Sequence, residues 1–173
     1  ESTFSGNRAH GHGGAIAFGS PAAPGFDPTV ATSIVDSTFT LNVADDNGDN
    51  ASSGGGLHAL LSGALVTVGG SIFAGNSDES PTTAAPDLRG ETTDLATAGF
   101  NIVGIRAGAG TVFAAGLPNA ANDWVGSTAS PLDPLLAPLV ENGGPTASHL
   151  PSLAPVSPAI DQGSCPNGFY DQR

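Results

Sequence analysis

Oxygen ligands are the first side chains in this sequence whose spacing suggests chemistry. Asp45, Asn47 and Asp49 alternate within the run DDNGDN, as carboxylate and amide ligands do in calcium-binding loops. Glycine falls at Gly48, and no Glu follows at the distance that such a loop requires. The run therefore indicates either a calcium site at these three residues or a solvated acidic turn.

Three imidazoles form the second group. His10 and His12 alternate, so both would lie on one side of a strand, and His58 follows a later Gly-Gly-Leu element. Imidazoles bind transition metals, but no Cys or Glu lies nearby to complete a site. Solvent-facing histidines, or histidines stacked at a corner of the fold, are the simpler interpretation.

Polysaccharide cleavage would need carboxylates in one groove, and a lyase would also need calcium and a basic residue. The candidate carboxylates are Asp36, Asp45, Asp46 and Asp49. The candidate basic residues, which lie in separate polar stretches, are Arg8, Arg89 and Arg106. Trp124 is either a platform for a sugar or a plug on the side of the fold. These scattered residues favour a protein that is not an enzyme, with a polysaccharide lyase or hydrolase as the alternative.

The charge of the chain restricts its partners. Sixteen acidic residues face four basic ones, all of them Arg, for a formal net charge of −12. Nucleic acids and anionic membranes are bound by clustered Lys and Arg, so both are poor partners for this chain. No apolar run approaches the length that spans a bilayer, which predicts no membrane insertion.

The elements that must position these residues follow from a repeat. Its Phe-x-x-Asn part occurs with a spacing of 35 and then 34 residues, a period typical of a solenoid. The members are Phe4 and Asn7, Phe39 and Asn42, Phe73 and Asn76, with Asn101 in a further Phe-Asn pair. We expect the Phe rings to stack inside and the Asn residues to form a ladder at corners, in the left-handed conformation. The turn glycines are Gly13, Gly14, Gly55 and Gly56.

Composition supports an all-β solenoid with long loop insertions. The chain has 173 residues, 25 of them Gly, and only 6% aromatic residues, which suits thin layers of small side chains in one domain. Helix is not expected, because no window keeps a 3.6-residue period without Gly or Pro. We expect strands over 30–40, 99–104 and 111–115, and a long excursion without strands over 77–97. Residues 1–130 would form the coils, and the Pro-rich residues 131–173 would run extended along the stack or cover its end.

Two resemblances add to this interpretation. The FxxN and GGAI or GGGL tetrapeptides resemble bacterial polymorphic outer-membrane-type repeats. The series GFNIVG, DPLL, NGGPT, SPAIDQG and DQR resembles the carboxy-terminal part of exported right-handed parallel β-helix proteins of the choice-of-anchor Q type. The resemblance implies a right-handed parallel β-helix that is exported by a bacterial-type route, is secreted or held at the cell surface, and has no defined activity.

Cys165 is the single cysteine of the chain. Its residue type alone leaves open a bond to a missing partner, a bridge between molecules or a free thiol. The choice-of-anchor Q resemblance implies a disulfide with a further segment, because those proteins continue with a second cysteine beyond the DQR motif.

The function that we expect is a non-catalytic structural or adhesive one. Partners would be further copies stacked head to tail into filaments, the missing parts of a parent protein, or glycans. No cofactor is expected other than possible Ca²⁺. The alternative is a β-helix protein that binds or cleaves polysaccharide.

Overall fold

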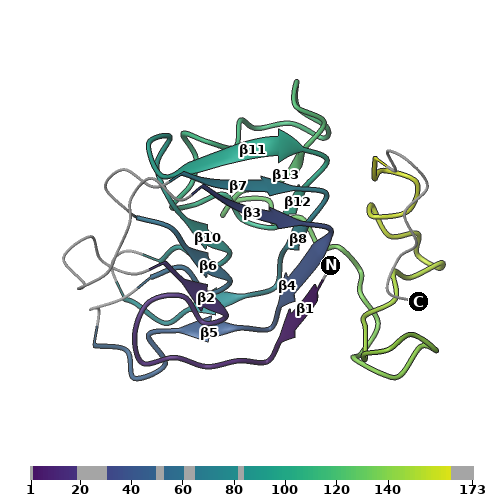
Figure 1. Ribbon diagram of the computed structural model, residues 1–173, viewed down its shortest axis with the longest axis horizontal. Helices are drawn as coiled ribbons and strands as arrows, with labels where there is room; N and C mark the ends of the chain where they lie inside the picture. Colours follow the sequence, from purple (N-terminus) through teal and green to yellow (C-terminus); the bar gives the residue numbers. More distant parts are fainter. Residues whose placement is uncertain (1, 19–30, 50–52, 61–64, 82–83, 165–173) are drawn as a thin grey trace.

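The computed structural model describes residues 2–18, 31–49, 53–60, 65–81 and 84–164 (Figure 1). Within these residues all nine strand pairings are parallel, and the chain forms no helix. It follows that no helix in this part of the chain could cross a membrane. The prediction of an all-β chain of stacked parallel strands is confirmed.

One sheet contains the strands that carry the repeated Phe residues. In spatial order its strands are β1 (Ser2–Ser5), β4 (Ser37–Thr40), β8 (Ile72–Phe73), β12 (Ile102–Val103) and β13 (Trp124–Val125). Phe4 pairs with Phe39, and Phe39 pairs with Phe73, so the repeat period sets the register of the sheet. We call this the Phe sheet.

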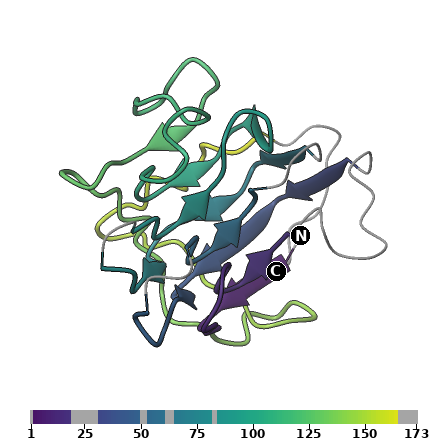
Figure 2. The same ribbon diagram turned by 90° about the vertical axis from the view of Figure 1, so that its left-hand side faces the viewer.

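Three smaller sheets follow the Phe sheet on each pass of the chain (Figures 1 and 2). The first contains β5 (Val43–Ala44) and β9 (Ser77–Asp78), and Arg8 bridges to Val43 in the same direction. The second contains β2 (Ile16–Ala17), β6 (Leu57–His58) and β10 (Leu88–Arg89). The third contains β3 (Thr32–Val35), β7 (Val66–Gly69) and β11 (Leu95–Gly99). The chain thus visits the sheets in a fixed order, and each pass stacks on the one before.

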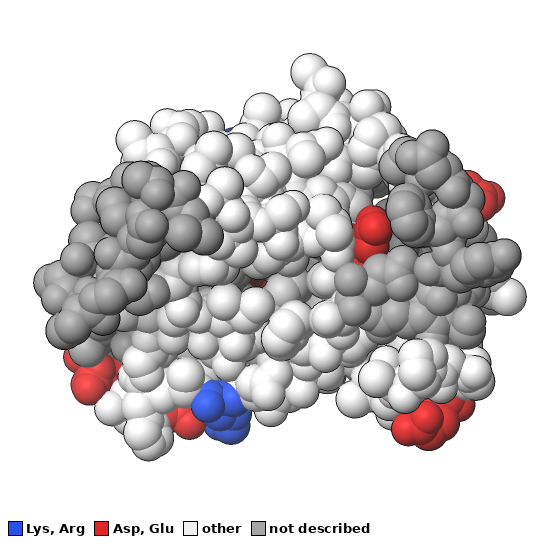
Figure 3. Space-filling model, viewed as in Figure 1, with Lys and Arg blue, Asp and Glu red and all other residues white. Residues whose placement is uncertain are grey.

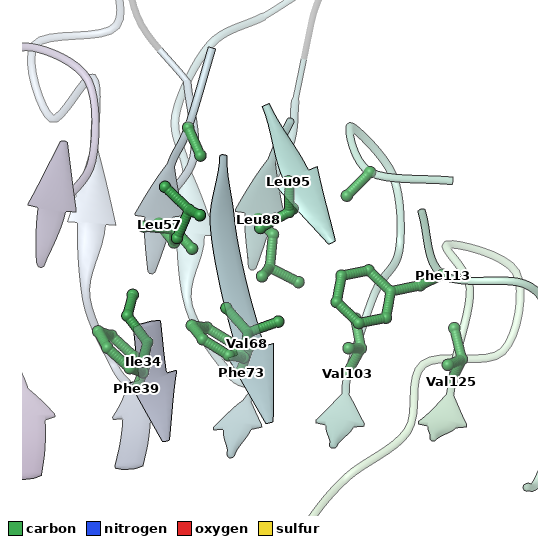
Figure 4. Packing of buried hydrophobic residues seen from close by; sticks show 13 residues of the cluster. Ile34, Phe39, Leu57, Val68, Phe73, Leu88, Leu95, Val103, Phe113 and Val125 are labelled. Carbon is green, nitrogen blue, oxygen red and sulfur yellow. The ribbon is translucent and has the colours of Figure 1, made fainter. Parts of the chain in front are cut away.

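The core lies between these sheets and is built from columns of like side chains (Figure 4). Phe39 and Phe73 are fully buried, and their ring centroids lie 4.5 Å apart at an interplanar angle of 11°. Phe4 stacks on Phe39 at 4.6 Å and 8°. Val103 and Val125 continue the column in β12 and β13. Because side chains alternate along a strand, the neighbours of these residues face outward.

The expected strand over 30–40 is wrong as a single element. The chain forms β3 and β4 with a sharp corner between them at Asp36, whose φ is 49°. The β-branched residues on both sides indicated extended backbone but carried no signal for the corner. One predicted strand is therefore two strands in two different sheets.

The expected excursion without strands over 77–97 is also wrong, because this segment holds β9 and β10 and begins β11. The sequence of β9 is polar and those of β10 and β11 are mixed, and each strand pairs with a strand one pass earlier. The expected strand over 111–115 forms a turn instead, in which the Val112 and Phe113 amides both donate to Ala109 O. Phe113 is fully buried and points into the interior next to Val103 (Figure 4).

The described part of the Pro-rich segment, residues 131–164, lies beside the Phe sheet (Figure 1). It folds back on itself through antiparallel bridges between Leu136 and Pro151 and between Val140 and Ser148. His149 Nε2 lies 2.9 Å from Ser5 Oγ, which joins this segment to the first pass. Cys165 and the final DQR motif lie outside the described residues.

Candidate functional site

The repeated Asn residues form a ladder of hydrogen bonds along the stack. The backbone N and side-chain Nδ2 of Asn7 donate to Asn42 Oδ1, at 3.1 and 2.8 Å. Asn42 donates in the same way to Asn76 Oδ1, at 3.1 and 2.9 Å. These bonds run in one direction, from each pass to the next, while the Nδ2 groups of Asn42 and Asn76 also donate back to Phe4 O and Phe39 O.

The left-handed residues at this corner are the ones before each Asn, which corrects the prediction that Asn itself takes that conformation. Gly6, Leu41 and Gly75 have φ values of 71°, 60° and 71°. A left-handed residue turns the chain sharply, so the following side chain can cap the amide of the pass before. The residue that makes the turn is therefore the one directly before the Asn that forms the ladder.

A second ladder lies at the other end of the Phe-sheet strands, and it includes Asn101. The amide of Ser2 donates to Ser37 Oγ, the amide of Ser37 to Ser71 Oγ, and the amide of Ser71 to Asn101 Oδ1. The prediction that Asn101 continues the Asn7 ladder is wrong, because Ile102 pairs with Ile72 and so aligns Asn101 with Ser71. The bonds of this second ladder run in the same direction as the Asn-to-Asn bonds of the first, from each pass to the next.

A buried carboxylate ends each ladder. Asp87 Oδ1 accepts from the backbone and side chain of Asn76 at 3.1 and 2.9 Å, and Asp87 Oδ2 accepts from the Ile105 amide at 2.7 Å. Asp123 Oδ1 accepts from the backbone and side chain of Asn101 at 3.0 and 2.9 Å. An ionised carboxylate only accepts hydrogen bonds, which suits the last position of a ladder in which each side-chain oxygen accepts from the preceding Asn or Ser. Sequence reasoning missed both acids, since neither lies in a repeat motif.

Burial raises the pKa of Asp87 to about 6, although the hydrogen bonds from Asn76 and Ile105 act in the opposite direction. Only 1% of its surface is exposed, and no ion pair involves it among the described residues. The position therefore carries an electrostatic cost at neutral pH, because the anion has lost its hydration.

The turn glycines of the first two passes align through the pairing of β2 with β6. Ile16 pairs with Leu57, so Gly13 corresponds to Gly54 and Gly14 to Gly55. Gly13 has φ 64°, and a Cβ there would lie 2.1 Å from Ile16 O. This corner therefore requires a residue without a side chain.

The predicted calcium ligands make other contacts. Asp45 is fully buried and accepts from Ser80 Oγ at 2.8 Å, whereas Asn47 Nδ2 donates to Asp49 at 3.0 Å on the surface. Among the described residues no three His, Cys, Asp or Glu side chains are arranged to hold a metal. Binding of Ca²⁺ at Asp45, Asn47 and Asp49 stays a prediction.

The other acidic candidates also have structural contacts. Asp46 contacts Arg8 at 3.3 Å and His10 Nδ1, and these contacts, with the His10 hydrogen bond as the largest cause, lower its pKa. Arg8 also pairs with Glu79 at 3.3 Å. In Figure 3 the basic atoms form one small patch beside acidic atoms on a face that is otherwise mostly uncharged.

Two of the histidines stack, which is the simpler of the interpretations drawn from the sequence. The rings of His12 and His58 lie 4.0 Å apart at 25°, and the Ser53 amide donates to His12 Nδ1 at 3.1 Å. Burial, and next the neighbouring His12, lower the pKa of His58 to about 4. His58 therefore stays neutral over the physiological range, which suits ring stacking.

Three hollows lie on the described part of the surface. One of about 370 Å³ separates the corners at Leu41 and Gly75 from the C-terminal segment, and a smaller one of about 90 Å³ lies between Trp124 and that segment. Trp124 thus faces a part of the chain itself. The third hollow, of about 470 Å³, surrounds Arg106. In the sequence Arg106 lies in a polar stretch apart from the other basic residues, and no pattern there indicates that it lines a hollow.

Comparison with known proteins gives one match, at the start of the chain. Residues 1–19 match the Chlamydia polymorphic membrane protein (Chlamydia_PMP) repeat, and this segment contains Phe4, Asn7, Gly13 and Gly14. No significant match was found among curated proteins or solved structures. The resemblance to choice-of-anchor Q proteins therefore stays a prediction. The first pass of the chain is similar to a polymorphic membrane protein repeat.

Proposed function

We propose that this chain is a right-handed parallel β-helix with a structural or adhesive role outside the cell or at its surface. The fold would be one unit in which residues 131–164 brace the side of the stack. The role would require no catalytic centre.

The main observation behind this proposal is that the buried polar side chains form hydrogen bonds along the stack. Asn42, Asn76 and Asp87 bond to one another along the stack, and Asp45 bonds to Ser80 of the next pass. In an enzyme such groups would converge on a groove where substrate binds. Here their hydrogen bonds hold successive passes in register, which suits a rigid extended scaffold.

The surface location rests on the repeat. The matching family is named for membrane proteins, and the first 19 residues of this chain are similar to its repeat. The net charge of −12 favours solubility and disfavours binding to anionic surfaces. Export by a bacterial-type route is part of the proposal.

Association through the end of the stack is the second part of the proposal. The first pass presents Phe4, which is half-buried and stacks on Phe39, and Asn7, which is exposed at the start of its ladder. A second copy, or another segment of a parent protein, would cover Phe4 and extend the stack. Glycans are the other class of partner that we propose.

Electron microscopy with light scattering of the purified chain over a range of concentrations tests this function. We expect rods or larger end-to-end assemblies whose fraction rises with concentration, and whose formation is weakened by Phe4→Ser. The conservative control is Thr38→Ser, on the outward face of the same sheet. Discrete monomers at all concentrations, together with Ca²⁺-dependent cleavage of acidic polysaccharide, would instead establish the polysaccharide-active alternative.

A further inference from the structure

The two arginines in the second half of the described chain have no acidic partner, although acids outnumber basic residues fourfold. Arg8 makes two ion pairs, but neither Arg89 nor Arg106 makes one among the described residues. Arg89 Nε is buried without a hydrogen-bond partner. In a chain of net charge −12, two unpaired guanidinium groups are unexpected and need a physical reason.

Both arginines lie next to the same turn. Arg106 begins this turn, whose Ala109 amide donates to Arg106 O at 3.0 Å. A Cβ on Gly108 would lie 3.3 Å from Arg89 Cδ, so the Arg89 side chain packs against Gly108. Two carboxylates at this turn bond to other groups, because Asp87 accepts from the Ile105 amide and Glu91 accepts from Thr111 Oγ1. Neither carboxylate forms an ion pair with Arg89 or Arg106 among the described residues.

Arg106 lines the open hollow of about 470 Å³ together with Gly108, Gly110, Ser127 and Thr128. Among the described residues the guanidinium makes a single long hydrogen bond, 3.4 Å from Nη1 to Phe113 O, which leaves most of its donors for a ligand. Ser127 Oγ accepts from the Ser130 amide and retains its own proton to donate. The volume falls within the range of small-molecule sites, about 300–1,000 Å³.

Further donors line the hollow. Among the described residues, the amides of Gly108 and Gly110 and the hydroxyl of Thr128 have no hydrogen-bond partner. Two methyl groups, of Ala107 and Ala129, complete the lining. The hollow thus combines one guanidinium, hydroxyl and amide donors, and small apolar patches.

We propose that this hollow binds a small saccharide that carries one carboxylate, such as a hexuronate. The guanidinium plane matches a carboxylate through two parallel hydrogen bonds. The hydroxyls and amides suit ring hydroxyls, and the alanine methyls suit the apolar face of a sugar ring. A polyanionic chain is disfavoured by the overall negative charge, so one carboxylate is favoured over many.

This inference deepens the proposal of glycan partners by naming a site and a ligand class, and it does not rest on the structural role. The test is a titration of the ¹⁵N-labelled full chain with galacturonate and glucuronate, followed by NMR. We expect saturable shifts of the Gly108 and Gly110 amides and of the Arg106 Nε–H signal. Glucose, acetate and inorganic phosphate serve as separate probes, and each should bind at least about tenfold more weakly than the uronates.

Two charge-matched variants make the test specific. Arg106→Gln keeps a donor for Phe113 O but removes the charge, and should weaken uronate binding about tenfold to a hundredfold, as expected for a charged hydrogen bond. Arg8→Gln removes the same charge elsewhere and should leave binding unchanged. The proposal is overturned if no uronate gives saturable shifts, if acetate or phosphate binds as tightly, or if the two variants behave alike. Circular dichroism of both variants checks that each is folded.

Discussion

Leu41 shows how the stack imposes a conformation that its side chain disfavours. It has φ 60° and lies between Gly6 and Gly75 in the same column of left-handed corners. A residue with a Cβ in this conformation costs about 1–2 kcal/mol. The strain is tolerated because the amide of Leu41 donates to Gly75 O and Asn42 then joins the ladder.

Leu41→Gly should stabilise the fold by about 0.5–1 kcal/mol, because relief of strain exceeds the added flexibility of the unfolded chain. The side chain is 59% exposed, so little apolar burial is lost. Chemical denaturation measures the difference. Leu41→Ala keeps the strain and should give no gain. If Leu41→Gly has a lower free energy of unfolding than Leu41→Ala, the left-handed conformation is not what limits stability at this position.

Asp87 should make stability depend on pH in an unusual direction. Its pKa in the folded state, about 6, lies above the ordinary value of 3.8, so the folded chain binds the proton more tightly than the unfolded chain does. Its contribution is complete below about pH 3.8 and is lost as the pH rises through 6, a change of about 3 kcal/mol. Asp87→Asn should remove this dependence.

The measurement is the free energy of unfolding of wild type and Asp87→Asn between pH 4 and 7. His58 acts in the opposite direction, since its lowered pKa makes the folded state weaker as the pH falls. The difference between the two proteins therefore isolates Asp87. If the difference in unfolding free energy between the two proteins is the same at every pH in this range, the pKa of Asp87 is not raised. A pH-independent part of that difference, present together with a pH-dependent part, reflects the lost hydrogen bond from the Ile105 amide.

At the scale of elements, the two ladders determine how strands of only two residues keep their register. Strands β1 and β4 begin at a Ser and β8 begins directly after one, and Ser37 and Ser71 accept from the amide of the pass before. An Asn follows three residues after each Phe and extends the other ladder. Such short strands have little pairing energy of their own. The side-chain bonds at both corners supply the missing specificity.

Asn42→Ala should destabilise the fold by about 3 kcal/mol, because Asn42 is fully buried and both donates to Asn76 Oδ1 and accepts from Asn7. Asn7→Ala, at the exposed end of the ladder, should cost about 1 kcal/mol or less. Thermal or chemical denaturation compares the two variants. Equal effects would contradict a ladder in which burial decides the cost.

Asn42→Asp tests why carboxylates occur only at the ends of the ladders. A carboxylate at position 42 could accept from Asn7 but could not donate to Asn76 Oδ1 or to Phe4 O. At neutral pH it should destabilise the fold at least as much as Asn42→Ala, and the loss should shrink at low pH as the acid gains a proton. A stable variant at pH 7 would show that ladder direction does not restrict the acids.

At the scale of the whole molecule, self-repulsion among acids is the main electrostatic term. Sixteen acidic residues face four arginines, and the described ion pairs all lie around Arg8 and His10. Salt screens this repulsion, so the melting temperature should rise with NaCl concentration.

Divalent cations separate screening from a specific calcium site. Because Asp45 is buried against Ser80, we expect CaCl₂ and MgCl₂ at equal ionic strength to raise the melting temperature equally. A larger effect of Ca²⁺ that is lost in Asp49→Ala would show binding at Asp45, Asn47 and Asp49 after all.

The sequence by itself determined the class of the fold and its period. The spacing of Phe4, Phe39 and Phe73 carries their register, since residues one turn apart in a stack must lie over one another. Composition predicted the absence of helix, and the scarcity of basic residues made anionic polymers poor candidates as partners, both from the sequence alone.

Only the tertiary structure decided what lies between the motifs. Strands β9 and β10 are defined by pairing with the pass before, and their two-residue sequences are too short to carry a local signal. The roles of Asp87 and Asp123 depend on which amides a neighbouring pass leaves to be bonded. The setting of Arg106 depends on two loops more than ten residues apart in the chain. These features arise from contacts across passes, and a single pass of sequence does not contain them.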